Sequence, residues 1–151
     1  MIANRQTLIE KSATKNVRYE LDDVFYSFWF RFIFKYSYII EIENYGKLQE
    51  IISRDYNTFS GLMLERYFHR VAMESEEYTR LGCWWDRKGE NEIDMIAEDE
   101  LSDKATFFEI KRQKDEISIG VLKQKAEVFL GANHLFKDYE IAYKGLSMED
   151  M

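Results

Sequence analysis

This chain of 151 residues contains no proline, one cysteine and two histidines. The absence of proline argues against a proline-rich linker or a disordered tail of the usual kind. The single cysteine, Cys83, excludes an internal disulfide bond, so a reducing, cytoplasmic setting is expected. One cysteine and two histidines do not make a zinc site.

The sequence also lacks the motifs of several other protein classes. It has no GxxxxGK[ST] phosphate-binding loop, so no ATPase activity is expected from this chain alone. No segment resembles a Ser or Cys nucleophile elbow, and the polar first residues do not resemble a signal peptide. The most apolar window, 24–40, carries Arg31 and Lys35 and is too short for a membrane span, so no membrane association is expected.

What the chain does contain is enough apolar material for a folded domain. Hydrophobic residues make up 46% of the sequence and aromatic residues 16%, which predicts one unit with a substantial core. The formal net charge is -7. An acidic chain does not attract nucleic acid through its overall field, so such binding would require a local basic patch or a bound metal ion.

The segment 23–39 predicts a helix that is apolar almost all round. Two interpretations are open: a central packing helix, or a helix that contacts a partner protein. One predicted face carries Phe25, Phe28, Trp29, Phe32, Ile33 and Tyr36, and the opposite side carries Tyr26, Phe30 and Phe34.

Downstream, the hydrophobic period changes between helical and extended segments. A short strand is also expected over 17–21, with no partner nearby in the sequence. The elements expected after the aromatic helix are, in chain order, a short helix over 47–53, a break at 55–57, a longer helix from Asn57 or Thr58, strands over 83–85, 92–97 and 105–111, a helix over 117–130 closed by Gly131, and a strand over 139–143.

The order from residue 57 onward is therefore α-β-β-β-α-β, which fits a mixed sheet with helices on its faces. We expect an N-terminal helical segment over residues 1–56, packed on a domain over 57–151 as one compact unit.

Three residues on the expected strands indicate a metal-dependent hydrolytic site. Asp94 lies on the middle strand, and Glu109 and Lys111 project from the same face of the next strand because side chains alternate. Asp94 and Glu109 could bind Mg²⁺ or Mn²⁺, since such ions prefer carboxylates and water. Lys111 could orient the attacking water and offset developing charge.

Two further residues are candidates for a supporting role in this site. Glu65, on the preceding helix, could add a metal ligand directly or through water, and Gln124 (with Lys123) could touch phosphate or water. A solvated Glu65, and an ordinary surface ion pair around Glu109 and Lys111, remain alternatives. Asp86 and Lys88 form a rival Asp-x-Lys pair, but in a predicted hairpin turn with Gly89 at its tip.

Four segments, in this order, resemble the C-terminal domain (domain of unknown function 234) of archaeal-type AAA/STAND ATPases, a domain similar to the PD-(D/E)xK nuclease superfamily. They are YELDDVFYSFWFRFIF, FSGLMLERYF, WWDRKGENEIDMIAE and FFEIKR, and the resemblance covers about residues 15–145. It implies an α/β fold of restriction-endonuclease-like topology, preceded by an aromatic-rich helical segment. By that likeness Asp94, Glu109 and Lys111 match the Asp and Glu-x-Lys positions, and Glu65 matches the helical acid that precedes them.

The resemblance implies a nuclease-like domain of an ATPase-linked system, with metal-dependent cleavage of nucleic-acid phosphodiesters as one function. The family carries no firmly assigned activity. Family members normally carry an ATPase module and a winged-helix segment before this domain, and neither is found here, so we expect a C-terminal fragment or a solitary relative.

A different class of function is a non-catalytic regulatory or protein-interaction module that retains the fold. The negative net charge and the aromatic helix favour this alternative, whereas the intact Asp94, Glu109 and Lys111 set favours the nuclease. Expected partners are nucleic acid, and an ATPase module in cis or a partner protein bound through the helix Phe25–Tyr36. The sequence leaves a homo-oligomer open.

Overall fold

The computed structural model describes residues 2–6, 17–21, 23–86 and 88–151. It has the α-β-β-β-α-β order predicted from the sequence, with a helical segment in front of a four-stranded mixed sheet. None of the helices in these ranges is both long and apolar enough to cross a membrane.

The sheet has the strand order β3-β4-β5-β6. The strands are β3 (Arg80–Trp85), β4 (Glu92–Asp99), β5 (Lys104–Ile110) and β6 (Glu140–Leu146). β3, β4 and β5 pair antiparallel, and β6 pairs parallel to β5. Two parallel neighbours need a crossover connection, which helix α4 (Ile119–Ala132) provides.

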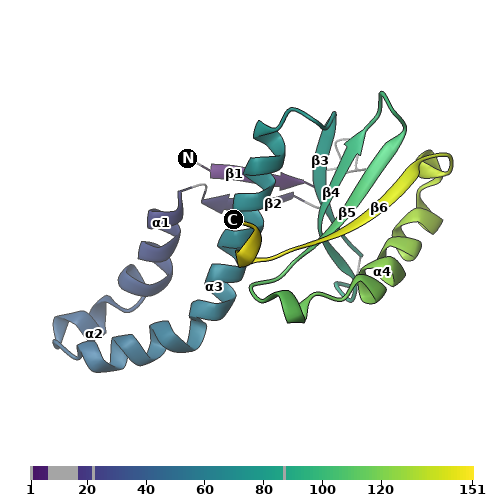
Figure 1. The fold of residues 1–151 in the computed structure, drawn as a ribbon. Coiled ribbons are helices and arrows are strands. Elements are labelled where there is room, and N and C mark those ends of the chain that lie inside the picture. Colours follow the sequence, from purple (N-terminus) through teal and green to yellow (C-terminus); the bar gives the residue numbers. More distant parts are fainter. Residues whose placement is uncertain (1, 7–16, 22, 87) are drawn as a thin grey trace.

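Helices α3 and α4 cover opposite faces of the sheet (Figure 1). Because both faces are covered, the central strands β4 and β5 are buried along most of their length. The cluster on the α3 side contains Leu64, Phe68, Ala72, Met95, Ala97, Phe108 and Ile110. The cluster on the α4 side contains Ile93, Ile96, Ala105, Phe107, Leu122, Ala126, Phe129 and Phe136.

The aromatic segment forms three short helices rather than one helix. α1 (Val24–Phe28) runs into a π-helical turn, η1 (Trp29–Phe34), and α2 (Ser37–Glu41) follows. A π turn has wider spacing than the i, i+3, i+4 pattern, so the predicted face does not form as a unit. Phe32 is fully buried, whereas Phe25 on the same predicted face is 63% exposed.

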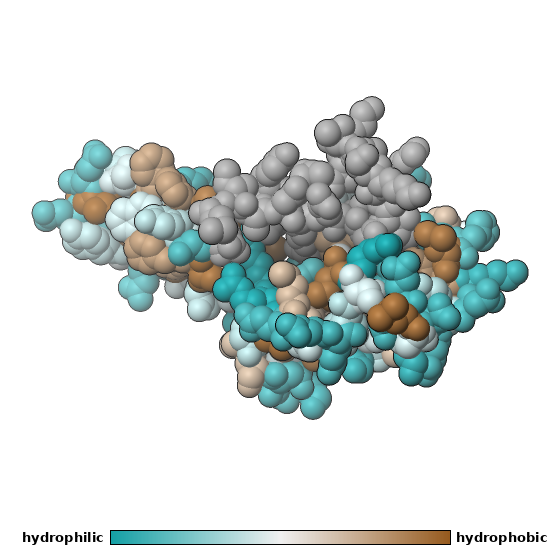
Figure 2. Space-filling view, turned by 90° about the horizontal axis from the view of Figure 1, so that it is seen from above, coloured by the Kyte–Doolittle hydropathy of each residue, from teal (hydrophilic) through white to brown (hydrophobic). Residues whose placement is uncertain are grey.

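Part of this segment packs on α3, as the first interpretation predicts, and the partner interpretation stays a prediction. The rings of Phe28 and Phe32 each contact the ring of Phe59 on α3 edge to face, and they are tilted relative to each other. Phe25, Phe30 and Phe34 are exposed, and the rings of Phe30 and Phe34 contact each other edge to face. Residues 24–41 form an aromatic lobe. Figure 2 shows hydrophobic residues interleaved with hydrophilic ones at the surface of this lobe, on the left of the view.

The predicted break at 55–57 is wrong. α3 is a single helix over Tyr45–Glu74, 30 residues long, and it spans the expected junction between residues 56 and 57. Asn44 caps it, with its side chain accepting a hydrogen bond from the Lys47 N–H at 3.3 Å. Aspartate and asparagine favour turns only when no packing opposes them, and here Leu48 and Phe59 are buried on either side of the predicted break. The division into 1–56 and 57–151 stays a prediction.

Two smaller expectations also need correction. The strand β2 (Val17–Leu21) has a partner, because it pairs antiparallel with β1 (Ile2–Gln6). Gly131 lies inside α4, and Asn133 is the C-cap residue, so the helix ends two residues later than its glycine suggested. α1 is capped by the Asp23 side chain, which accepts from the Tyr26 N–H at 3.0 Å.

Replacing Thr58 with proline tests whether α3 is continuous. Thr58 is exposed in the middle of α3, where proline removes a helix hydrogen bond and clashes with the preceding turn. We expect Thr58→Pro to lower the free energy of unfolding by about 3 kcal/mol, measured by urea denaturation beside Thr58→Ala. A proline tolerated at this position would instead place a helix start there, because proline suits the first residue of a helix.

Candidate active site

Strand β4 carries a β-bulge at Asp94. Between the pairs Gly82–Ile96 and Trp84–Ile93, strand β3 has one residue and β4 has two. Ile96 packs on the α4 side of the sheet. Regular alternation along β4 would then place Ile93 on the α3 side, so the extra residue changes which helix the following side chains face. Ile93 instead packs on the α4 side. Bulges of this kind redirect a side chain and increase the local twist.

Asp94 and Glu109 lie next to each other on β4 and β5. The pairing of these strands places Met95 opposite Phe108, and the next residues along are Asp94 and Glu109. Both acids are largely buried, at 8% and 5% exposure. Buried carboxylates require hydrogen-bond or charged partners, since desolvation otherwise penalises the ionised form.

The Asp94 carboxylate is held by the chain just after Glu109. Its Oδ2 accepts a hydrogen bond from the backbone N–H of Ile110 at 2.8 Å and lies 3.3 Å from the Lys111 ammonium. The backbone pairs between β4 and β5 run from Asp99 to Met95. The Asp94 side chain therefore supplies an acceptor to β5 where the backbone ladder has stopped.

The Glu109 carboxylate is held by helix α4. Its Oε2 accepts from the backbone N–H of Ser118 at 2.8 Å, and its Oε1 lies 3.9 Å from the Lys125 ammonium. Ser118 is the N-cap residue, so the carboxylate also faces the positive end of the helix dipole. Ser118 and Lys125 are seven residues apart, which is close to two helical turns, and therefore both face Glu109.

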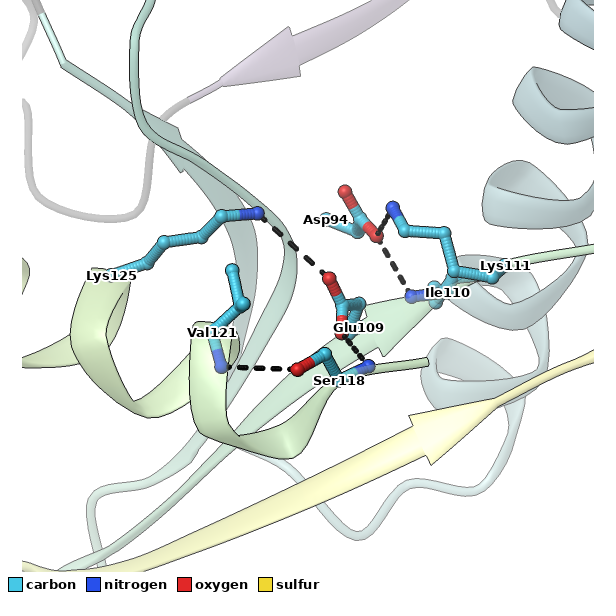
Figure 3. Close-up of polar contacts among 7 residues, drawn as sticks. All are labelled: Asp94, Glu109, Ile110, Lys111, Ser118, Val121 and Lys125. Atoms are coloured by element: carbon cyan, nitrogen blue, oxygen red, sulfur yellow. Dashed lines mark hydrogen bonds and ion pairs between the residues drawn. The ribbon is translucent and has the colours of Figure 1, made fainter. Parts of the chain in front are cut away.

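These contacts leave the two carboxylates between two lysines. Figure 3 shows Lys125 reaching Glu109 from α4 on one side and Lys111 reaching Asp94 from the end of β5 on the other. Formal charges at these four groups cancel. The two lysine side chains are 34% and 23% exposed, so the site opens to solvent on the lysine side while the acids stay covered.

The sequence pattern identified Asp94, Glu109 and Lys111 but missed Ser118 and Lys125. The structure brings the first three together, and Ile110 points to the α3-side cluster as strand alternation requires. A signal for Ser118 was present, since a serine just before an apolar helical pattern is an N-cap candidate. The approach of Lys125 depends on how α4 packs on the sheet, which local pattern does not encode.

The two residues expected to support the site, Glu65 and Gln124, lie on α3 and α4. Glu65 is half-buried on α3, and in the parts of the chain that the structure describes no three His, Cys, Asp or Glu side chains gather to hold a metal ion. Gln124 is exposed on α4, and its neighbour Lys125 is the residue directed at Glu109. The supporting roles of Glu65 and Gln124 stay predictions.

A close approach beside Glu109 sets the position of the α4 start. Gly145 of β6 is the parallel partner of Glu109. A Cβ atom added at Gly145 would lie 2.4 Å from the Cγ2 atom of Ile117, the residue before Ser118. Glycine at this position therefore lets the segment before α4 lie against the sheet, with the Ser118 N–H within reach of Glu109.

In the rival pair Asp86-x-Lys88, Asp86 has a structural role in the hairpin turn. The Asp86 carboxylate accepts from the backbone N–H groups of Glu90 and Asn91, at 2.9 and 3.1 Å, and from the Asn91 side chain at 2.8 Å. Gly89, with a φ of 71°, forms the tip as predicted. Asp86 is thus a turn residue.

Comparison with known proteins gives a family but no activity. A family model described as "Archaea bacterial proteins of unknown function" matches residues 29–127, more than half of the chain. An uncharacterized protein of Methanocaldococcus jannaschii is 36% identical over 115 residues, which cover 71% of this chain and 25% of that protein. The chain thus spans about a quarter of the length of this relative. No solved structure matches.

Replacing Gly145 with alanine tests the close approach to Ile117. The added methyl must displace a β-branched side chain, and overpacking of this kind costs about 1–3 kcal/mol. We expect Gly145→Ala to lower the free energy of unfolding by that amount and to shift the amide resonance of Ser118. Gly61→Ala is the matched control, because nothing lies within 4 Å of an added Cβ on α3. Equal stability of the two variants would contradict the packing described.

A pH-dependent prediction concerns Asp86. The hydrogen bond from the Asn91 side chain is the main reason that the pKa of the Asp86 carboxyl lies below its usual value. A carboxyl with a lowered pKa in the folded state stabilises the fold above its unfolded pKa of about 3.9. That contribution disappears as the pH falls through the folded value.

We therefore expect Asp86→Ala to lower the urea midpoint at pH 7, with the difference from wild type shrinking in acid. Asp138→Ala, at an exposed aspartate in the turn before β6, serves as the control at each pH. A difference that stays constant into acid would show that the carboxylate charge of Asp86 is not the source of the stabilisation.

Proposed function

The chain belongs to the DUF234 family, and we propose that its Asp94, Glu109 and Lys111 site cleaves nucleic-acid phosphodiester bonds with the help of a divalent metal ion. The observation that supports this function is the pairing of the strands. β4 and β5 bring two buried carboxylates to adjacent positions, with Lys111 3.3 Å from the Asp94 oxygen. Acid, acid and lysine at one point suit metal-dependent hydrolysis.

The donor set fits a hard divalent cation. Mg²⁺ is commonly bound by one or two carboxylates, with water and substrate phosphate filling the remaining positions. Asp94 and Glu109 supply two such carboxylates, and their anchoring by the Ile110 and Ser118 amides keeps one oxygen of each oriented. When bound, Mg²⁺ or Mn²⁺ would supply Lewis-acid polarisation of a phosphate group.

The protein side chains have separate roles in this proposal. Asp94 and Glu109 would hold the cation, and one oxygen of each is anchored by an amide, at the end of β5 and just before α4. Lys111, partly exposed beside Asp94, orients the attacking water and stabilises charge that develops on the phosphate. Lys125 offsets the charge of Glu109 in the metal-free site. Glu65 would add a ligand directly or through water, and Gln124 would contact phosphate or water.

The second candidate function is a non-catalytic regulatory or protein-interaction module, and the exposed aromatic lobe favours it. Phe25, Phe30 and Phe34 present large apolar surfaces to solvent. Exposed apolar patches commonly mark interaction sites in soluble proteins. The carboxylates already have cationic partners, which is what a purely structural ion-pair cluster would also show.

We further propose that the domain serves an ATPase-linked system, with an ATPase module in cis or a partner protein contacting the lobe. The relative from Methanocaldococcus jannaschii is about four times as long as the matched region, so additional domains accompany this one there.

A cleavage assay separates the two functions. The purified chain is incubated with plasmid, linear and single-stranded DNA and with RNA, in Mg²⁺ or Mn²⁺, beside Glu109→Ala and Lys111→Ala. We expect each variant to lose about 100-fold or more in rate, the usual cost of removing a group that stabilises developing charge. Isothermal titration with Mn²⁺ should show weaker binding by Glu109→Ala.

Glu127→Ala and Lys137→Ala are the matched controls, because both residues are exposed and lie outside the site. Each should cleave at the wild-type rate. Equal cleavage by wild type, Glu109→Ala and Lys111→Ala would show that a contaminant or another site is responsible. No cleavage under any condition would leave the interaction module as the function of this chain.

A further inference from the structure

Strand β6 is an open edge of the central sheet. It pairs with β5 on one side, and no strand within the described ranges pairs with it on the other. The opposite edge strand, β3, has β1 near it. Natural proteins usually protect an open edge with charged side chains, a proline, a bulge or a very short strand, and β6 carries the charged side chains Glu140 and Lys144. β6 has seven residues in unbroken register with β5, and the chain contains no proline.

The unpaired backbone groups on β6 can be assigned from the existing hydrogen bonds. The Glu140 N–H donates to the Asp103 carbonyl at 2.8 Å, and the Leu146 carbonyl accepts from the Lys111 N–H at 3.0 Å. Both residues therefore direct their backbone groups toward β5. Because the direction alternates along a strand, Ile141, Tyr143 and Gly145 direct theirs toward the open edge.

One antiparallel pairing of β6 with itself matches this pattern. If a two-fold axis passes through Ala142, then Ile141 lies opposite Tyr143 of a second copy and the two residues exchange hydrogen bonds. The same register places Glu140 opposite Lys144 of the second copy, twice by symmetry. Opposite charges and an aromatic residue facing a β-branched one are favourable cross-strand pairs. Moving the axis to Tyr143 would set Glu140 against Leu146 and lose this match.

The exposure of the side chains agrees with this register. Glu140, Ala142 and Lys144 are exposed, and in a pairing centred on Ala142 they occupy the non-hydrogen-bonded positions, where the two strands come closest. Alanine at the axis has a small side chain, so two copies can approach there. Glu140 already has a cationic neighbour in its own chain, Lys104 at 3.3 Å, and would sit between two lysines in the pair.

We propose that two copies of this chain associate through their β6 strands, antiparallel and centred on Ala142, to form a continuous eight-stranded sheet. The partner is a second copy because the charges of β6 are complementary to the same strand turned by 180°. A C2 interface of this kind is isologous, so one surface serves both copies. The association does not depend on any cleavage activity.

A cysteine placed at the axis tests the register directly. In the proposed pairing the two Ala142 residues face each other at a Cα separation of about 4.5 Å, which is within the range of a disulfide bond. We expect Ala142→Cys to form a covalent dimer under mild oxidation, seen on a non-reducing gel. The native Cys83 is fully buried and should contribute no background.

Val128→Cys, on the exposed outer side of α4, is the matched control and should remain monomeric on the same gel. Covalent dimer formed equally by both variants would show random collision and overturn the proposal. A wild-type chain that is dimeric in solution, together with an Ala142→Cys variant that does not cross-link, would also overturn it, because another surface would then form the dimer.

Charge reversal tests the cross-strand pairs by a second route. Glu140→Lys or Lys144→Glu alone sets like charges opposite each other twice, and we expect each to weaken self-association about tenfold. An equimolar mixture of the two variants restores both pairs and should form a heterodimer with wild-type affinity. Sedimentation equilibrium measures all four samples.

A wild-type chain that stays monomeric over the accessible concentrations contradicts the inference, as does a mixture that associates no better than its components. Neither result bears on the cleavage assay, so the dimer and the nuclease can fail separately.

Discussion

The burial of β4 and β5 on both faces is the constraint on which the rest of the structure depends. Two helices exclude water from these strands, so each backbone N–H and carbonyl in them needs a partner within the protein. The regular ladder between β4 and β5 ends at Met95, and the Asp94 carboxylate then accepts the Ile110 N–H. An acid that could bind a metal ion is therefore also part of the sheet.

Glu109 is likewise both a candidate metal ligand and a part of the fold. It is anchored by the amide of Ser118, which starts α4, and so its position is tied to the helix that covers one face of the sheet. Removing the Asp94 carboxylate leaves the buried Ile110 N–H without its acceptor, and such groups are costly when unsatisfied. Removing the Glu109 carboxylate takes away the acceptor of the N–H just before α4. The lysines differ from the acids in this respect, because their ammonium groups lie nearer solvent and no buried N–H depends on them.

The order of elements could be predicted because the hydrophobic period changes clearly along the chain. The break expected at 55–57 could not be rejected from the sequence, since Asp55 and Asn57 are turn-forming residues whose helical state depends on the packing of Phe59. The π turn at Trp29–Phe34 could not be predicted for a similar reason. Local spacing favours an ordinary helix, and contacts between Phe28, Phe32 and α3 accompany the wider turn.

The site could be predicted to the extent that strand geometry determines it. Alternation places Glu109 and Lys111 together, and an antiparallel hairpin brings Asp94 alongside. The bulge could not be predicted, because an extra residue in β4 is visible only once β3 is paired with it. Lys125 was missed for a related reason: its distance from Glu109 depends on where a helix lies on a sheet, and that is set by the fit of Leu122, Ala126 and Phe129.

The continuity of α3 has a mechanical consequence. A helix of 30 residues is about 45 Å long, and one half packs on the sheet while the other carries the aromatic lobe (Figure 1). A molecule held at the lobe would therefore be held at a fixed distance and direction from the carboxylates, with no hinge inside the helix to absorb its movement. A force on the lobe would move α3 as one unit. The contacts of Leu64, Phe68 and Ala72 would transmit that movement to the sheet.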